Sequence, residues 1–101
     1  MADEPSNGDF IWDEEEDESG NVVHIWEHGV TPTEAEDAIL DPHAVPVQER
    51  WIGRERRYTI VGATPAGRIL IVVFVLKGDA IRVITSYPAS EREKRRYRRR
   101  H

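Results

Sequence analysis

Three β-type segments joined by very short connections constrain the fold more than any other feature of this chain. They span residues 57–63, 68–77 and 80–87, and a glycine stands in both connections. Connections this short leave no room for a crossover helix, so successive strands must run antiparallel. The middle segment is apolar on both faces from Ile69 to Leu76. That pattern predicts a central strand that is covered on both sides.

The last of these segments alternates between two faces, as expected of a strand with one buried side. Residues 81, 83 and 85 are predicted to point one way, and residues 82 and 84 the other. A charge in the middle of a strand must be paired or must face a cleft. Arg82 is therefore predicted either to pair with the acidic helix face that carries Glu34 and Asp37 or to meet a phosphate.

Local signals predict three helices in the chain. Asn21–His28 has apolar residues at helical spacing and ends at Gly29, a favoured residue after a helix C-terminus. Thr31-Pro32-Thr33-Glu34 is a capping box with proline at the first helical position, and its helix should end before Asp41. A last helix should begin near Ser90, because acidic residues precede a run of cations there.

A short β-type run at Phe10–Trp12 and a short strand at Val45–Gln48 complete the predicted order β-α-α-β-β-β-β-α. We expect an α+β domain, an antiparallel sheet of about four strands with two N-terminal helices and one C-terminal helix packed on it. Residues 9–98 are predicted to form a single domain, because a chain of 101 residues has room for one core. Residues 1–8 are predicted to be a disordered acidic tail, and residues 99–101 a basic tail.

Charge divides the chain into two unlike halves. Residues 1–50 hold 15 acidic residues and one basic residue, whereas residues 51–101 hold 13 basic and four acidic residues. The acidic balance argues against nucleic-acid binding, and the basic half argues for it. The lack of cysteine excludes a disulfide scaffold and a thiol nucleophile. No apolar run is long enough for a membrane span and the N-terminus lacks a signal-peptide pattern, so a cytoplasmic protein is predicted.

Two stretches combine residue types that suit RNA. Residues 51–58 interleave aromatic and arginine side chains, which can stack on bases and hold phosphates. The alternative for them is a hairpin whose solvated basic edge blocks edge pairing. Arg92–Arg100 has seven cations in nine residues, predicted to be a solvated helix or an electrostatic anchor for RNA or an acidic partner. His24 and His28 have the spacing of a two-histidine metal site, but no third ligand is evident, so no metal is predicted.

Several motifs follow one another in a specific order. They are His24–Glu36, Tyr58–Gly62, Gly67–Phe74, Ile81–Thr85 and Glu91–Tyr97, and the opening Phe10–Asp13 precedes them. Their order and spacing resemble those of BrnT-type toxins over roughly residues 9–98. The resemblance implies a compact RelE-like fold and a ribonuclease toxin of a type II toxin–antitoxin system. Such a toxin is held inactive by an antitoxin that carries a ribbon-helix-helix DNA-binding part.

The resemblance also implies metal-independent RNA cleavage without a cofactor, in which the 2′-hydroxyl attacks the adjacent phosphate. Arg82, with Arg57 or Arg68 beside it, would supply cations to the phosphate, and His28 would be the general acid or base. Arg54, Arg68 and Tyr97 are the candidates for RNA binding. The expected partners are the RNA substrate and a cognate antitoxin, with which the chain would form a hetero-oligomer.

Three features depart from the family pattern. Glu27 stands where many members have lysine, and Ser86-Tyr87-Pro88 stands where many have an arginine. The acidic block Asp13–Gly20 is predicted to be a solvated insert or a frayed first turn, and Glu14–Gly20 looks like an insertion. The first two features remove cations from the expected active face, and the third adds negative charge. The alternative function is therefore a catalytically weakened, toxin-like module that binds an antitoxin-type partner or nucleic acid without cutting.

Overall fold

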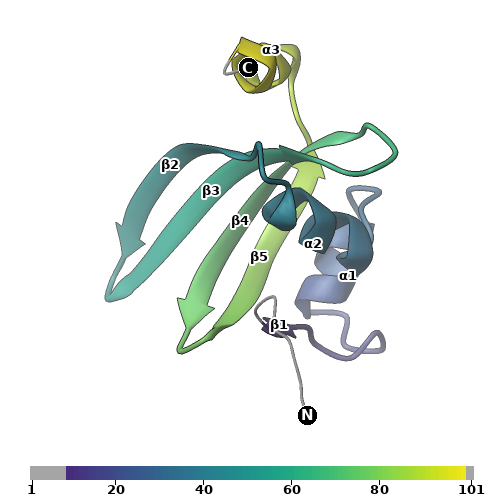
Figure 1. Ribbon diagram of the computed structural model, residues 1–101. Helices are drawn as coiled ribbons and strands as arrows, with labels where there is room; N and C mark the ends of the chain where they lie inside the picture. Colours follow the sequence, from purple (N-terminus) through teal and green to yellow (C-terminus); the bar gives the residue numbers. More distant parts are fainter. Residues whose placement is uncertain (1–8, 100–101) are drawn as a thin grey trace.

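Residues 9–99, which the computed structural model describes, form an α+β fold in the predicted element order (Figure 1). The strands are β1 (Asp9–Ile11), β2 (Val45–Ile52), β3 (Glu55–Ala63), β4 (Ile69–Lys77) and β5 (Ala80–Pro88). The helices are α1 (Asn21–Trp26), α2 (Pro32–Leu40) and α3 (Glu91–Arg99). The predicted tail at residues 1–8 and the end of the basic tail lie outside the described residues.

The sheet has five strands in the order β1-β5-β4-β3-β2, and β1 runs parallel to β5 whereas the other neighbours are antiparallel. The prediction of about four antiparallel strands was therefore too simple. A strand as short as β1 has no periodicity from which its pairing could be inferred, and only its contact with the free edge of β5 sets its direction. Strand β2 is longer than the predicted Val45–Gln48, and it joins β3 through Gly53, which has a φ of +63°.

The apolar core confirms that β4 is central, but both of its faces are fully covered only at residues 70–72, and Leu76 is 53% exposed. Leu70 and Val72 of β4 are fully buried on the face that α1 and α2 cover, together with Ile25. Ile71 is fully buried on the opposite face, in a smaller cluster against which Tyr97 of α3 packs. Figure 1 shows α3 at one end of the strands, so it covers only part of that second face. The remainder of the second face stays open.

Local capping determines where the helices begin and end. The predicted capping box of α2 is present, since the Glu34 amide donates to Thr31 Oγ1 and the Thr31 amide donates to Glu34 Oε1. Helix α1 is shorter than predicted because Gly29 adopts a φ of +75° and the Val30 amide donates back to the Ile25 carbonyl. No helix among residues 9–99 is long and apolar enough to cross a membrane.

Candidate nucleic-acid interface

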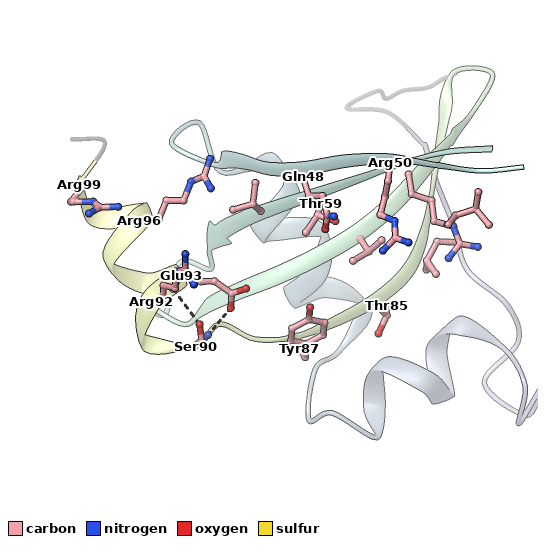
Figure 2. A pocket seen from close by; sticks show the side chains of 15 residues that line it. Gln48, Arg50, Thr59, Thr85, Tyr87, Ser90, Arg92, Glu93, Arg96 and Arg99 are labelled. Atoms are coloured by element: carbon pink, nitrogen blue, oxygen red, sulfur yellow. Dashed lines mark hydrogen bonds between the residues drawn. The ribbon is translucent and has the colours of Figure 1, made fainter. Parts of the chain in front are cut away.

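A groove of about 1000 Å³ lies between the open face of the sheet and α3 (Figure 2). Five arginines and one glutamate line it, which gives the lining a formal charge of +4. The arginines, which define the arginine groove, are Arg50, Arg57, Arg92, Arg96 and Arg99. Val73 forms part of the floor, and it points away from the helix-covered face because its neighbour Val72 points into that core.

The ladder between β2 and β3 brings two of these arginines face to face. Arg50 is paired directly with Arg57, and Gln48 with Thr59, and all four side chains line the groove. Like charges directly opposite each other destabilise a sheet. Arg57 has an ion pair with Glu55 at 3.3 Å, whereas Arg50 has no hydrogen-bond or ion-pair partner among residues 9–99. This unfavourable juxtaposition is typical of a site that binds an anion.

A β-bulge in β5 adds two side chains to the groove. Val73 pairs with Thr85 and Phe74 pairs with Val83, so Ile84 is an extra residue in the ladder. Ile84 and Thr85 both line the groove, whereas Val83 is fully buried on the helix-covered face. The prediction that residues 83 and 85 share a face was therefore wrong, because the bulge shifts the alternation by one residue.

Helix α3 forms the far wall and presents its arginines on one face. Arg92, Arg96 and Arg99 follow one another at spacings of four and three, so they share a side of the helix. The helix begins near Ser90 as predicted, with a capping box in which the Ser90 amide donates to Glu93 Oε1 and the Glu93 amide donates to Ser90 Oγ. The sequence S-E-R-E carried this signal.

A tyrosine and a histidine stand at the wall formed by β5. Tyr87 lines the groove, and Figure 2 shows its hydroxyl directed toward the side lined by Gln48 and Thr59. The His28 ring lies edge-on to the Tyr87 ring with centroids 5.9 Å apart, and the His24 ring lies 5.4 Å from that of His28. His28 does not itself line the groove, and it contacts the lining through Tyr87.

Arg82 forms a two-pronged ion pair with Asp13, with contacts of 3.1 and 2.9 Å, and does not line the groove. The prediction that Arg82 pairs with Glu34 or Asp37 was wrong, because Asp13 in the loop after β1 pairs with the guanidinium instead. Asp13 also accepts a hydrogen bond from the Asn21 amide at 2.9 Å, which fixes the start of α1. The Arg82 guanidinium, with the Asn21 amide, holds the pKa of the Asp13 carboxyl below its usual value.

This ion pair predicts a pH-dependent contribution to stability. Because the folded-state pKa of Asp13 is lowered, the pair stabilises the fold above the ordinary pKa of 3.8, and this stability is lost as the pH falls below that value. Asp13→Asn is expected to lower the urea midpoint at pH 7, and the difference from the wild type should shrink as the pH falls below 3.8.

Glu16→Gln is the matched control, because Glu16 is an exposed acid of the same loop with no partner among residues 9–99. Its urea midpoint should equal that of the wild type at pH 7 and below pH 3.8. A difference between Asp13→Asn and wild type that persists unchanged at acidic pH would show that charge is not what the Asp13 carboxylate contributes.

The remaining predicted RNA-binding residues lie outside the arginine groove. Arg54 is in the β2–β3 turn, at a second cavity. Arg68 donates to Glu34 and to the Gly29 carbonyl, so it ties the β3–β4 connection to the helices. The Thr31 amide, together with Arg68, lowers the pKa of Glu34.

Tyr97 fastens α3 to the end of α2. Its hydroxyl donates to Asp41 Oδ2 at 2.6 Å, and the Ala63 amide donates to the same oxygen at 2.8 Å. Burial raises the pKa of the Asp41 carboxyl, but these hydrogen bonds outweigh burial and bring the pKa below its ordinary value. The structure therefore gives Tyr97 a role in orienting the wall of the groove.

Neither histidine belongs to a metal-ligand cluster in the part of the chain that the structure describes. No group of three or more histidine, cysteine, aspartate or glutamate side chains there is arranged to hold a metal ion. His24 and His28 are exposed and contact each other by their ring edges. The polar groups at the groove are the guanidinium, hydroxyl, amide and carboxylate groups of its lining, together with the His28 imidazole that contacts Tyr87.

The fold and the groove together define a small α+β protein with a cationic surface suited to a nucleic-acid backbone. The family described as "Ribonuclease toxin, BrnT, of type II toxin-antitoxin system" matches residues 12–93. The chain belongs to this family of ribonuclease toxins, and the resemblance inferred from its motifs is confirmed. Membership in a toxin–antitoxin family implies an antitoxin as partner. No curated protein matches the chain.

Proposed function

We propose that this chain cleaves single-stranded RNA in the arginine groove without a metal ion and that a cognate ribbon-helix-helix antitoxin neutralises it. The observation that carries the proposal is the lining of five arginines and one glutamate, in which Arg50 and Arg57 oppose each other. A bound phosphate would relieve the repulsion between those two guanidiniums. RNA also supplies the 2′-hydroxyl that allows cleavage without an external nucleophile.

The proposed reaction is an intramolecular phosphoryl transfer. The 2′-oxygen attacks the adjacent phosphorus while the bond from phosphorus to the 5′-oxygen breaks. One product ends in a 2′,3′-cyclic phosphate and the other begins with a 5′-hydroxyl. Arg57 and Arg50 would hold the phosphate oxygens, whose negative charge increases in the transition state. Arg82 is engaged by Asp13, so we assign it to the support of the N-terminal loop rather than to the phosphate.

Two proton transfers must accompany these bond changes, and Tyr87 of β5 and His28, whose ring contacts that of Tyr87, offer a group for each. We assign the proton of the attacking 2′-hydroxyl to the His28 imidazole, because its ring contacts Tyr87 of the lining and an imidazole nitrogen can accept a proton. The Tyr87 hydroxyl, which lines the groove, would donate a proton to the departing 5′-oxygen. Exchange with water then restores both groups.

The antitoxin part of the proposal rests on charge and on the free edge of β2. An acidic segment would meet the five groove arginines, and β2 is an edge strand to which an extended segment could add. One observation favours the alternative of a binding module without cleavage, namely that Asp13 occupies the Arg82 guanidinium. The same experiment separates the two functions.

The test is cleavage of single-stranded RNA by the purified chain in the presence of EDTA. Fragments should carry 2′,3′-cyclic phosphate and 5′-hydroxyl ends. Tyr87→Phe removes the hydroxyl but keeps the ring against His28, so kcat should fall by about 100-fold without a change in the melting temperature. His28→Ala should also lower kcat.

Each alternative outcome has a definite meaning. RNA that binds tightly but is never cut, whatever the concentration of wild-type protein, would establish the binding module. Activity that EDTA abolishes and magnesium restores would contradict the metal-independent mechanism. A Tyr87→Phe variant with wild-type kcat would remove Tyr87 from the proton transfers.

A further inference from the structure

A second surface with the residue types of an RNA site lies at the end of the β2–β3 hairpin. Trp51 is 61% exposed, Leu76 is 53% exposed and Ile52 is 44% exposed, which is unusual for large apolar side chains on one small area. Figure 1 shows this end of the hairpin pointing away from α1 and α2. We call the surface formed by Trp51, Ile52, Arg56, Tyr58 and Leu76 the aromatic tip.

The Trp51 ring is held on one side and open on the other. Trp51 is paired with Arg56 across the ladder, and the Arg56 guanidinium lies 5.7 Å from the Trp51 ring centroid and 5.4 Å from that of Tyr58. Glu49 holds Arg56 by an ion pair. Tyr58 in turn stacks on Phe74 with centroids 5.6 Å apart. The indole is thus positioned in advance, which reduces the entropy lost when a planar ligand stacks on it.

The aromatic tip carries positive charge and lies around the edge of the sheet from the arginine groove, because Trp51 and Arg56 point to the opposite face from Arg50 and Arg57. A cavity of about 640 Å³ at the tip is lined by Arg54, Arg56 and Lys77, with Glu55 as its one carboxylate. Glu55 is already paired with Lys77 at 3.1 Å, whereas Arg54 has no partner among the described residues. Ile52 lines both this cavity and the arginine groove. A strand of RNA leaving the groove would therefore pass around the β2 edge at Ile52 to reach the tip.

We propose that the aromatic tip is a stacking subsite for the base of a nucleotide that flanks the cleaved phosphate. The base would lie on the open side of the Trp51 indole, and Arg54 would contact a backbone phosphate. Stacking on an aromatic ring beside an arginine is a recurring way to hold single-stranded RNA. This inference rests on the proposed function, because it extends the RNA path out of the arginine groove.

Edge protection does not account for the exposed indole. The charges of Glu49 and Arg50 on the edge strand β2 already resist unwanted pairing. An exposed tryptophan beside Leu76 works against that purpose, since it adds apolar surface to the edge. A ligand that has both a flat apolar base and a negatively charged backbone accounts for the exposed indole and for the arginines beside it.

The test measures binding of fluorescein-labelled, 2′-O-methylated RNAs of about 5 and about 15 nucleotides by fluorescence anisotropy. Methylation of the 2′-oxygen prevents cleavage, so binding is measured alone. Trp51→Ala should weaken binding of the longer RNA by roughly tenfold or more and leave the shorter RNA unaffected. Trp51→Phe should restore most of the affinity, because it restores a ring.

The matched control is Trp26→Ala, since Trp26 is equally exposed at 64% but lies on α1, away from both cavities. It should bind both RNAs like the wild type. A longer RNA that is abasic outside its central nucleotides should bind wild-type protein and Trp51→Ala equally.

The outcomes separate this inference from the proposed function. Equal binding of the longer RNA by wild type and Trp51→Ala overturns the subsite, even if unmodified RNA is cleaved. Loss of affinity only with the longer RNA, in a protein that cleaves no unmodified RNA, supports the subsite and overturns the cleavage proposal. Wild-type protein that binds neither RNA overturns both. A Trp51→Ala variant that binds RNA normally but no longer binds an antitoxin assigns the tip to a protein partner and overturns the subsite.

Discussion

Arg57→Ala is expected to lower kcat/KM for RNA cleavage by about 100- to 1000-fold, the usual effect of removing one group that stabilises transition-state charge. Arg57 lies on β3, a strand with a neighbour on each side, and its side chain lies beside that of Arg50 in the ladder between β2 and β3. Its partner Glu55 lies at 3.3 Å in a partly exposed pair, so the loss of that pair should cost at most about 1 kcal/mol of stability. Cleavage of a fluorogenic RNA and a thermal melt measure the two effects separately.

Arg98→Ala is the control for a general loss of positive charge. Arg98 lies on α3 beside the groove arginines but is exposed and does not line the groove. It should retain activity close to wild type. The kcat/KM of Arg57→Lys should lie between those of wild type and Arg57→Ala, because an ammonium keeps the charge but loses the planar two-pronged contact with phosphate. Equal losses in Arg57→Ala and Arg98→Ala would show that only the overall charge of the molecule matters.

The features that the sequence predicted correctly are those that neighbouring residues determine. Thr31 and Glu34 are three apart, and their capping box needs nothing from the remainder of the fold. Gly29 ends α1 for an equally local reason, its φ of +75°. The apolar run in β4 likewise predicted its central place, because a strand buried on both faces needs apolar residues at every position.

The site could be predicted only in part, because strand register and loop contacts determine it. Arg57 was predicted as a site residue and lines the groove. Its neighbour Arg50 was not, because the β2–β3 pairing that brings it there is not encoded in any local sequence pattern. Tyr87 was interpreted as the loss of a cation, whereas the structure places its ring in the lining. The face of α3 that carries Arg96 could have been found from helical spacing alone.

Arg82 shows the limit of reasoning from a single charged residue. Its position in the middle of β5 correctly required a partner, but the choice among acids depended on how the loop after β1 folds back. Asp13 stands in the acidic block of the sequence, where six of eight residues carry the same charge. Only the hydrogen bonds between Asp13 and Asn21 distinguish it from the exposed acids that follow.

The largest expected loss of stability comes from Gly62→Ala, which should destabilise the fold by about 3 kcal/mol or more. Gly62 lies on β3 directly beneath α2, and a Cβ atom there would stand 2.1 Å from the carbonyl oxygen of Ala38. The obstacle is backbone, with the Ala38 carbonyl carbon also only 2.9 Å away, so no rotation of a side chain can relieve it. The helix would have to move away from the sheet and open the core around Ala38, which is now fully buried.

Gly67→Ala separates this steric effect from the ordinary cost of replacing glycine. Gly67 has a φ of +91° and nothing within 4 Å of an added Cβ, so it should lose only roughly 1–2 kcal/mol through backbone strain. In thermal melts, Gly62→Ala should therefore lower Tm by at least about 10 °C and by clearly more than Gly67→Ala. Equal Tm values for the two variants would mean that α2 lies farther from β3 than the 2.1 Å approach to the Ala38 oxygen implies. The arginine groove lies on the opposite face of the same strands, so the clash would also loosen the scaffold that holds Arg50 against Arg57.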